Sequence, residues 1–304
     1  MKKVSVIGAG SWGSALAVLL ANNGHEVTLW THDPHEIEML STKREQQEKL
    51  PDNIAIEADL ETALTDEDVV VMAVPSPVVR TVAKQMSPFV KDGQIIVNVA
   101  KGIEDVTYKT LSDIIEEEIP NAEVCVLSGP SHAEEVGIGI PTTVVIGAKN
   151  KKTAEMLQDV FMNKVFRVYT SSDIIGIELG GALKNVIALA AGTVDGLGYG
   201  DNTKAALMTR GIAELTRLGE AMGGKPETFS GLTGVGDLIV TCTSVHSRNR
   251  KAGYLMGKGM TADEAMKEVK MVVEGVYSAK AALGLAKKCN VSVPIVEAVN
   301  RVLF

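Results

Sequence analysis

Short apolar runs alternate with amphipathic stretches along the chain up to Tyr169. The runs are mostly β-branched, uninterrupted and bounded by glycine, proline or charge, which is typical of strands buried on both faces of a sheet. They predict strands at Val4–Ile7, Val27–Trp30, Val69–Val74, Ile95–Val99, Val124–Leu127, Thr143–Ile146 and Val165–Tyr169. Amphipathic stretches such as Val106–Glu118 and Thr153–Phe161 predict helices between them. This alternation predicts an α/β fold with a right-handed, doubly wound parallel sheet.

The pattern changes after Tyr169, where strand-like runs almost disappear and long alanine- and leucine-rich segments follow. These segments predict helices at Ile174–Ala191, Thr203–Met222, Ser247–Lys258, Thr261–Lys270, Tyr277–Lys288 and Ile295–Leu303. We therefore expect an α/β domain over residues 1–172 and an all-α domain over residues 173–304. The last helix reaches Phe304 with no glycine, proline or polar cap after it, so we expect the natural chain to continue.

Composition narrows the possible classes of protein. The 304 residues are 45% hydrophobic with a formal net charge of −8, which argues against disorder and against a general nucleic-acid surface. The three cysteines, Cys125, Cys242 and Cys289, show neither metal-ligand spacing nor a disulfide framework, so we expect a cytoplasmic protein without a metal. We see no secretory signal, and no apolar stretch of the ~20 residues that cross a bilayer. An integral membrane segment is therefore not expected.

The segment Gly8-Ala9-Gly10-Ser11-Trp12-Gly13 has the spacing of a dinucleotide-binding loop. It follows a predicted strand and opens a predicted helix, which is the context that this motif requires. Gly8 permits the tight turn, Gly10 lets the backbone approach a pyrophosphate, and Gly13 lets the helix pack on the strand. The pyrophosphate of NAD or NADP is then expected on the helix N-terminus, in an N-terminal domain of Rossmann type. The alternative is a glycine turn that serves packing alone.

The end of the second predicted strand bears on the choice between NAD and NADP. Asp33 lies 20 residues after the last glycine of the motif, near where an acid can hold a ribose 2′-OH. His32, Lys43 and Arg44 are close in sequence and could instead receive a 2′-phosphate. Asp33 followed by Pro34 also reads as a simple helix start, with Asp as the N-cap. The choice of cofactor therefore stays open.

Candidate chemistry follows the ends of two later strands. Lys101 comes after Ile95–Val99, where open α/β sheets bind ligands, although it could be an exposed loop lysine. In the segment after Val124–Leu127, Gly129 would bring the backbone near a ligand, and Ser131 could cap a helix or donate to substrate. His132 has no obvious partner in the sequence, and we assign it no role.

In the helical half, Gly176, Gly180 and Lys184 recur every four residues and share one helix face. Each glycine in a helix costs about 1 kcal/mol relative to alanine, so a ligand or another backbone should press on this face. Aliphatic surroundings would lower the pKa of Lys184 toward neutrality, as proton transfer requires. The alternative is close helix packing with a lysine whose head reaches solvent.

Two further segments of this half could bind a phosphorylated substrate. The glycine-rich run Gly231–Asp237 ends on an acid that could bond a substrate hydroxyl or orient a lysine. Ser247 reads as an N-cap, and Arg248 and Asn249 at the helix start would make a phosphate cradle. The alternative is a surface helix start with Arg250 and Lys251 as solvated charges.

Several of these segments together resemble one family, the bacterial NAD(P)-dependent glycerol-3-phosphate dehydrogenases. The resemblance rests on Gly-Ala-Gly-Ser-Trp-Gly, Val-Ala-Lys-Gly-Ile-Glu, Leu-Ser-Gly-Pro-Ser-His-Ala, Gly-Gly-Ala-Leu-Lys-Asn-Val-Ile-Ala, Gly-Leu-Thr-Gly-Val-Gly-Asp-Leu and Ser-Arg-Asn-Arg, in this order from Lys2 to Phe304. It implies interconversion of dihydroxyacetone phosphate and sn-glycerol 3-phosphate with NAD(P)H and NAD(P)+, a reaction that supplies phospholipid synthesis.

The resemblance also implies residue roles. Lys184 is the implied proton donor or acceptor, and Lys101 the implied contact to both substrate and cofactor. The other implied substrate-binding residues are Gly129, Ser131, Asp237, Ser247, Arg248 and Asn249. The other implied cofactor-binding residues are Gly8, Gly10, Ser11, Trp12, Gly13, His32, Ala133, Arg248, Val272 and Glu274. The family also leans toward a homodimer, which the apolar helices of the second half make plausible.

Two other functions remain open at this stage. One is another helical-domain hydroxyacid dehydrogenase, acting on 6-phosphogluconate or a hydroxyisobutyrate-like acid. The other is a non-catalytic NAD(P)-dependent sensor, against which the presence of Lys101, Lys184 and Arg248 argues.

Overall fold

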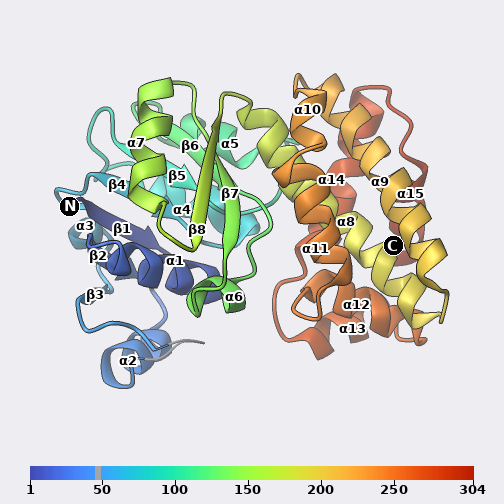
Figure 1. Ribbon diagram of the computed structural model, residues 1–304, viewed down its shortest axis with the longest axis horizontal. Helices are drawn as coiled ribbons and strands as arrows, with labels where there is room; N and C mark the ends of the chain where they lie inside the picture. The colour runs from blue at the N-terminus through green and yellow to red at the C-terminus, as the bar shows by residue number, and fades with distance from the viewer. Residues whose placement is uncertain (45–48) are drawn as a thin grey trace. The chain divides into compact units, whose positions relative to one another are not determined.

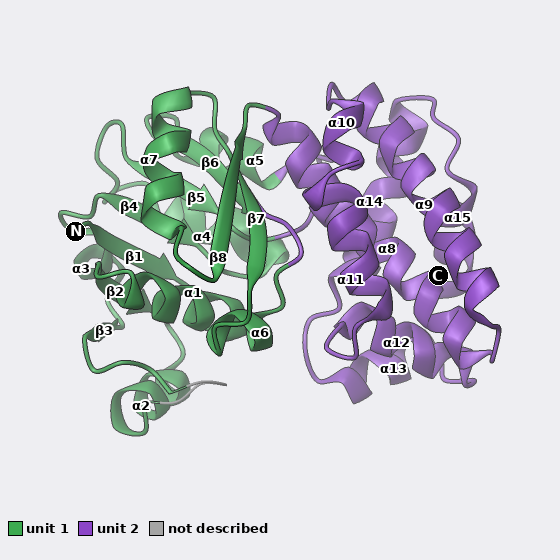
Figure 2. Cartoon of the chain, viewed as in Figure 1, with its two compact units in different colours: residues 1–100, 111–127, 131–172 green, residues 101–110, 128–130, 173–304 purple. Residues whose placement is uncertain are grey.

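The computed structural model describes residues 1–44 and 49–304, which form two compact units (Figure 2). Unit 1 comprises residues 1–100, 111–127 and 131–172, and unit 2 comprises residues 101–110, 128–130 and 173–304. The main break falls after Ser172. A single boundary in the sequence does not separate the two units, because the short segments 101–110 and 128–130 belong to the helical unit. These two segments carry Lys101 and Gly129.

Unit 1 is built on one eight-stranded sheet with the strand order β3-β2-β1-β4-β5-β6-β7-β8. Its strands are β1 (Lys3–Ile7), β2 (Glu26–Trp30), β3 (Ile54–Glu57), β4 (Val69–Met72), β5 (Ile95–Asn98), β6 (Glu123–Ser128), β7 (Thr142–Gly147) and β8 (Phe166–Ser171). The pairs from β3 across to β6 are parallel, and so is β7 with β8. The predicted α/β fold class is confirmed.

Alternate residues of the strands enter two separate cores, one on each face of the sheet. Val69 and Val71 of β4 belong to the core that contains α1 (Ser11–Asn22) and α7 (Lys151–Phe161). Val70 and Met72 belong to the core under the helices α3 (Leu60–Leu64), α4 (Val79–Met86) and α5 (Leu111–Glu118) (Figure 1). Because side chains alternate along a strand, a strand covered on both faces must be apolar at every position, as β4 is.

The helices of unit 1 are mostly short and connect the strands. They are α1, α2 (Pro34–Thr42), α3 (Leu60–Leu64), the 3-10 turn η1 (Ser76–Val78), α4 (Val79–Met86), α5 (Leu111–Glu118), α6 (Ala133–Gly137) and α7.

The elements of unit 1 differ from the prediction in two details. The strand β3 was not predicted, because its short run Ile54–Glu57 ends on a charged residue and β3 lies at the edge of the sheet. The helix predicted from Val106 begins only at Leu111. The preceding residues instead close a loop through an antiparallel bridge between Ile103 and Thr110.

From residue 173 onward, the described elements of unit 2 are all helical. They are α8 (Ile174–Gly196), α9 (Asp201–Ala221), α10 (Pro226–Phe229), the π-helical turn η2 (Leu232–Gly236), α11 (Asp237–Thr243), α12 (Arg248–Gly257), α13 (Ala262–Val269), α14 (Glu274–Lys288) and α15 (Pro294–Leu303). The glycine-rich run Gly231–Asp237 therefore contains the turn η2, and its last residue, Asp237, begins α11. The helices α10 and α11 were not predicted.

The helix α8 is the centre of unit 2 and is packed on most sides (Figure 1). Gly192 and Gly196 of α8 lie against the backbone of α12, and Gly253 and Gly257 of α12 lie against the backbone of α8. A methyl group at any of these positions would overlap the other helix. The glycine spacing of four residues on both helices thus permits their close crossing.

Among the described residues, one helix, α8, is long and apolar enough to cross a membrane. However, 89% of that stretch is buried inside the protein. The expectation that no apolar stretch reaches this length is therefore wrong, but the stretch is a core helix, and no integral membrane segment is indicated.

Candidate functional site

The glycine loop of unit 1 joins β1 to α1, and its three glycines differ in what surrounds them. Gly8 has φ +116°, and a side chain there would lie 2.8 Å from the carbonyl oxygen of Ala73. A methyl group on Gly13 would overlap the carbonyl oxygen of Gly8, because α1 sits directly on the turn. A methyl group on Gly10 would meet nothing within 4 Å. The protein itself requires Gly8 and Gly13, whereas the space beside Gly10 is open to a ligand.

The start of α1 fits a dinucleotide pyrophosphate. Gly10 is the N-cap residue and offers no side-chain hydrogen bond to the first turn, so the amide groups of this turn remain available to an anion. The hydroxyl of Ser14 donates to the carbonyl of Ala9 at 3.0 Å and supports the turn from inside. Open space at Gly10, uncapped amides and the helix dipole together form a cradle for a phosphate group.

The end of β2 carries the residues that bear on cofactor choice. The Asp33 carboxylate caps α2 by accepting from the amide of His35 at 2.8 Å, so the predicted N-cap is confirmed. The Arg44 guanidinium donates to the carbonyls of Pro51 and Ile54, which ties it into its own loop. His32 is exposed and stacks on Trp30, with ring centroids 5.8 Å apart.

A buried cluster of charges forms the chemical centre of unit 2. Lys184 is 5% exposed, and its ammonium group donates to Oδ1 of Asp237 and, at 2.6 Å, to the hydroxyl of Thr241. Asp237 is 1% exposed, and its Oδ2 accepts from Lys101 at 2.7 Å. One carboxylate thus joins two lysines that are far apart in the sequence. Burial of charges requires such pairing, since an isolated buried ion is strongly unfavourable.

Burial and ion pairing shift the pKa values of Lys184 and Asp237 in opposite directions. Burial lowers the pKa of Lys184 to about 7, and this effect outweighs the attraction of Asp237, while Lys101 lowers the pKa further. For Asp237, burial alone would raise the pKa of the carboxyl, but the two lysines outweigh burial and hold it below its usual range. Lys184 can therefore gain and lose a proton near neutral pH beside a carboxylate that stays charged.

Lys101 approaches this cluster from the loop after β5. Besides Asp237 it donates to the carbonyl of Gly129 at 2.9 Å, and its side chain is 20% exposed. Gly129 has φ +143°, a conformation that favours glycine. The alternative interpretation of Lys101 as a solvated loop lysine is therefore wrong.

The glycine face of α8 is occupied by the protein itself. A side chain at Gly180 would lie 2.5 Å from the carbonyl oxygen of Thr233, and one at Gly176 would overlap the Asp173 carboxylate, which caps α8. One at Gly181 would lie 2.8 Å from the hydroxyl of Ser128. Close packing thus explains the glycines. Lys184, however, does not reach solvent as the packing alternative required.

The start of α12 is the predicted phosphate cradle. Ser247 is the N-cap, since its hydroxyl accepts from the amide of Arg250 at 3.2 Å, and Arg248 is exposed. The side chain of Asn249 is buried and already bonded: it donates to Asn185 at 2.9 Å and accepts from the amide of Gly275 at 2.8 Å. Asn249 therefore ties α12 to α8 and to the start of α14.

Arg250 is not a solvated charge, which corrects that part of the alternative interpretation. It donates to Asp195 at 2.9 and 2.7 Å, and Lys204 bonds the other oxygen of Asp195 at 2.6 Å. This ion-pair group connects α8, α9 and α12. Lys251 is exposed, as the alternative interpretation expected.

The remaining predicted residues divide between the two units. Ser131 and Ala133 lie in unit 1, where Ala133 begins α6. Because the N-cap position of α6 is His132, the structure does not favour the alternative in which Ser131 caps this helix. Val272 and Glu274 lie in unit 2 at the start of α14.

Three side chains of the unit 2 site were not singled out from the sequence. Thr241 bonds Lys184, Asn185 bonds Asn249, and the buried Ser128 hydroxyl has no hydrogen-bond partner among the described residues. Thr241 lies one helical turn after Asp237, so helical spacing could have indicated it if α11 had been predicted.

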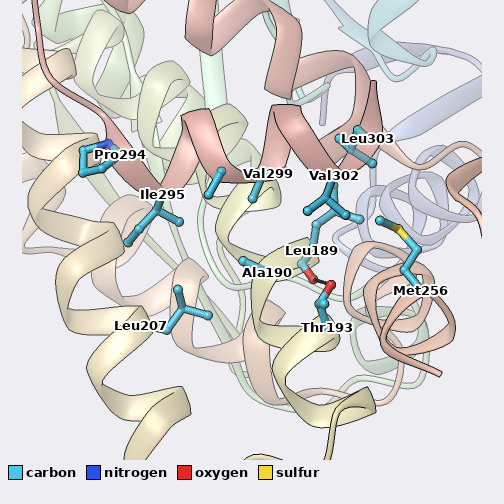
Figure 3. Close-up of a pocket in the computed structure, with 11 residues that line it drawn as sticks. Leu189, Ala190, Thr193, Leu207, Met256, Pro294, Ile295, Val299, Val302 and Leu303 are labelled. Carbon is cyan, nitrogen blue, oxygen red and sulfur yellow. Dashed lines mark hydrogen bonds between the residues drawn. The ribbon is translucent and has the colours of Figure 1, made fainter. Parts of the chain in front are cut away.

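A separate pocket of 320 Å³ lies in unit 2 beside α8 and α15 (Figure 3). Its lining is almost wholly apolar, and its one hydroxyl, that of Thr193, donates to the carbonyl of Leu189 at 3.0 Å. No cation lines it, so it does not suit a phosphorylated ligand.

Comparison with known proteins agrees along the whole chain. Residues 3–154 match the profile described as NAD-dependent glycerol-3-phosphate dehydrogenase N-terminus, and residues 173–304 match the corresponding C-terminus. The chain is 64% identical over 309 residues to glycerol-3-phosphate dehydrogenase [NAD(P)+] of Agathobacter rectalis, covering 100% of this chain and 92% of that protein. The enzyme of the same name from Fusobacterium nucleatum is 61% identical, with 100% and 93% covered. The crystal structure of glycerol-3-phosphate dehydrogenase from Coxiella burnetii superposes with a TM-score of 0.95 at 35% identity, covering 99% of this chain and 94% of that one.

Proposed function

Because this chain belongs to the NAD-dependent glycerol-3-phosphate dehydrogenase family, we propose that it interconverts dihydroxyacetone phosphate and sn-glycerol 3-phosphate. In the direction of synthesis, the ketone carbon gains a hydride and the carbonyl oxygen gains a proton. The observation that carries the proposal is the buried Lys184, paired with Asp237 and with a pKa of about 7, in a family of dehydrogenases. The product would supply phospholipid synthesis.

Lys184 is the residue that moves the proton in this proposal. Protonated, it donates to the carbonyl oxygen of dihydroxyacetone phosphate; neutral, it accepts the hydroxyl proton of glycerol 3-phosphate in the reverse direction. Asp237 and Thr241 hold the ammonium group in place. The positive charge of Lys101 stabilises negative charge that develops on the substrate oxygen.

The substrate phosphate is assigned to the start of α12. In this proposal the exposed Arg248 guanidinium and the Ser247 hydroxyl bind the phosphate at the helix N-terminus, where the dipole also favours negative charge. Asn249 fixes this turn to α8 through its hydrogen bond to Asn185. Gly129 and Ser131 complete the substrate-binding set, as family resemblance implies.

NAD or NADP supplies or takes up the hydride when it is bound. The proposed holding residues are Gly8, Gly10, Ser11, Trp12 and Gly13 of the loop, with the other contacts from His32, Lys101, Ala133, Arg248, Val272 and Glu274. The open space at Gly10 and the uncapped amides of α1 support the loop assignment.

The decisive experiment is a spectrophotometric assay of NAD(P)H oxidation. The purified chain should oxidise NAD(P)H with dihydroxyacetone phosphate and act poorly on dihydroxyacetone. Loss of a charge-assisted phosphate contact costs about 1.5–3 kcal/mol, so kcat/KM should differ by roughly 10–150-fold. Equal kcat/KM for the two ketones would remove the phosphate assignment.

The alternatives make different predictions in the same assay. A hydroxyacid dehydrogenase would turn over carboxylate substrates such as 6-phosphogluconate, and a sensor would bind NAD(P)H without turnover. The family match and the intact lysine pair favour the ketose phosphate reaction.

We further propose a cytoplasmic homodimer that binds neither nucleic acid nor metal. Three unpaired cysteines and the net charge of −8 support the location and the lack of a nucleic-acid surface. Light scattering on the purified protein measures the oligomeric state, and a monomer at micromolar concentration would contradict the dimer.

A further inference from the structure

The loop from Lys101 to Thr110 is a closed structure that belongs to unit 2. Ile103 and Thr110 pair in an antiparallel bridge, and the amide of Glu104 donates to the carbonyl of Lys109 at 3.1 Å. Inside the loop, the amide of Tyr108 donates to the carbonyl of Glu104 at 2.9 Å. These bonds close the loop on itself, and Lys101 lies only two residues before its first paired residue.

Two side chains attach this loop to the helical core of unit 2. Ile103 is 4% exposed and belongs to that core. The ring of Tyr108 is half-buried against the same core, where Gly284 of α14 leaves room for it. An added methyl group at Gly284 would overlap the Tyr108 ring.

Tyr108 adopts a backbone conformation that is unfavourable for its residue type. Its φ is +61°, in the left-handed region that bulky residues rarely occupy. Such strain persists only where surrounding contacts enforce it, and it clusters at functional segments. The seat of the ring on Gly284 is a contact able to enforce it.

We propose that Tyr108 and Gly284 form a latch that positions Lys101: the ring occupies the notch at Gly284 and holds the loop where the Lys101 ammonium reaches Asp237 and the carbonyl of Gly129. Tyr108 is a positioning residue in this scheme, since it acts through Lys101. The proposal rests on the proposed dehydrogenase activity, and it assigns a role to two residues outside the phosphate, proton-transfer and cofactor sets.

The first test is Gly284→Ala, which fills the notch while favouring the helix, because alanine is the better helix former. The melting temperature should stay close to wild type, whereas kcat should fall about 10- to 100-fold, as misplacement of a catalytic group by about 1 Å does. Gly200→Ala is the matched control, because its methyl group meets nothing within 4 Å. The control should keep the wild-type kcat.

Variants at the other half of the latch test whether the two residues act together. Tyr108→Phe keeps the ring and should keep kcat near wild type. Tyr108→Asn removes the ring with a residue that tolerates positive φ, and should lower kcat as Gly284→Ala does. The double variant should lose no more activity than either single variant. Additive losses would mean that ring and notch act independently, which overturns the latch.

A pH profile separates positioning of Lys101 from general destabilisation. The charged and titratable groups that bear on Lys184 are Asp237, Lys101 and Cys242. Lys101 lowers the pKa of Lys184, so displacement of Lys101 should raise that pKa. Because oxidation of glycerol 3-phosphate needs neutral Lys184, the rise of its rate with pH should then shift to higher pH in Gly284→Ala and Tyr108→Asn. An unchanged limb with reduced kcat would contradict the role assigned to Lys101.

Limited trypsin digestion tests the latch without using activity. In wild type the bond after Lys109 should resist cleavage, since Thr110 is 2% exposed, and both ring-displacing variants should be cut there faster. If wild type does not turn over dihydroxyacetone phosphate, the proposed function fails, and the digestion still decides the latch. Equal digestion of wild type and Gly284→Ala, with equal kcat, would overturn it.

Discussion

The glycine loop of unit 1 and the glycine-rich helix α8 of unit 2 use the same residue for different purposes. Around α8, the protein's own backbone or side chains fill the space beside Gly176, Gly180, Gly192 and Gly196. In the loop, Gly10 has nothing beside it. Open space beside a glycine leaves room for a ligand, and the chemistry that we propose for unit 2 depends on buried side-chain charges instead.

The largest loss of turnover is expected for Lys184→Ala, a substitution in unit 2 that leaves the glycine loop of unit 1 unchanged. Turnover should fall by about 10²–10⁴-fold, the usual contribution of a positioned acid–base group. NAD(P)H affinity should stay close to wild type, because the proposed pyrophosphate site lies on the loop of unit 1. Steady-state rates, cofactor titration and thermal melts on one purified variant measure all three properties.

A stable Lys184→Ala protein that retains more than about a tenth of the wild-type kcat would contradict this role. Lys101 would then be the next candidate for proton transfer.

Arg248→Ala should have the next largest effect, because it removes a cation from the proposed phosphate cradle. KM for dihydroxyacetone phosphate should rise roughly 10–150-fold, with weaker cofactor binding and an unchanged fold. Lys251→Ala is the matched control, an exposed cation on the same helix, and should leave KM unchanged. Equal kinetics for Arg248→Ala and wild type would remove Arg248 from both sites.

Two alanine substitutions in the glycine loop should have different effects, one on stability and the other on cofactor binding. Gly13→Ala should lower stability by about 1–3 kcal/mol, since its methyl group overlaps the Gly8 carbonyl. Gly10→Ala should keep the wild-type melting temperature but weaken NAD(P)H binding about tenfold or more, because only the ligand approaches there.

Melting curves and cofactor titrations of both loop variants provide the measurement. If Gly10→Ala bound NAD(P)H as tightly as wild type, the open space at Gly10 would not be the pyrophosphate site.

The last prediction concerns pH, which tests Lys184 without any substitution. With a Lys184 pKa of about 7, the oxidation of glycerol 3-phosphate, which needs neutral Lys184, should rise about tenfold per pH unit below pH 7 and level off above it. Reduction of the ketone needs protonated Lys184 and should fall by the same slope above pH 7. Rates of both directions across pH 5.5–9 measure these limbs. Parallel profiles for the two directions would contradict proton transfer by Lys184.

The amino-acid sequence by itself determined the fold class and most of the elements. Continuous β-branched runs such as β4 indicated strands covered on both faces, and the glycine motif indicated its loop because both signals are local. The helix face that carries Lys184 was visible for the same reason, since a four-residue repeat defines one side of a helix.

Only the tertiary structure decided what those residues touch. The pairing of Lys184 with Asp237, and of Asp237 with Lys101, joins positions separated by 53 and 136 residues, which no local pattern reports. The tertiary structure also showed that backbone fills the face at Gly180 while the space at Gly10 stays open. Burial and long-range contact arise only when the chain is folded. They determine the pKa of Lys184, and they determine whether the space beside each glycine is filled or open.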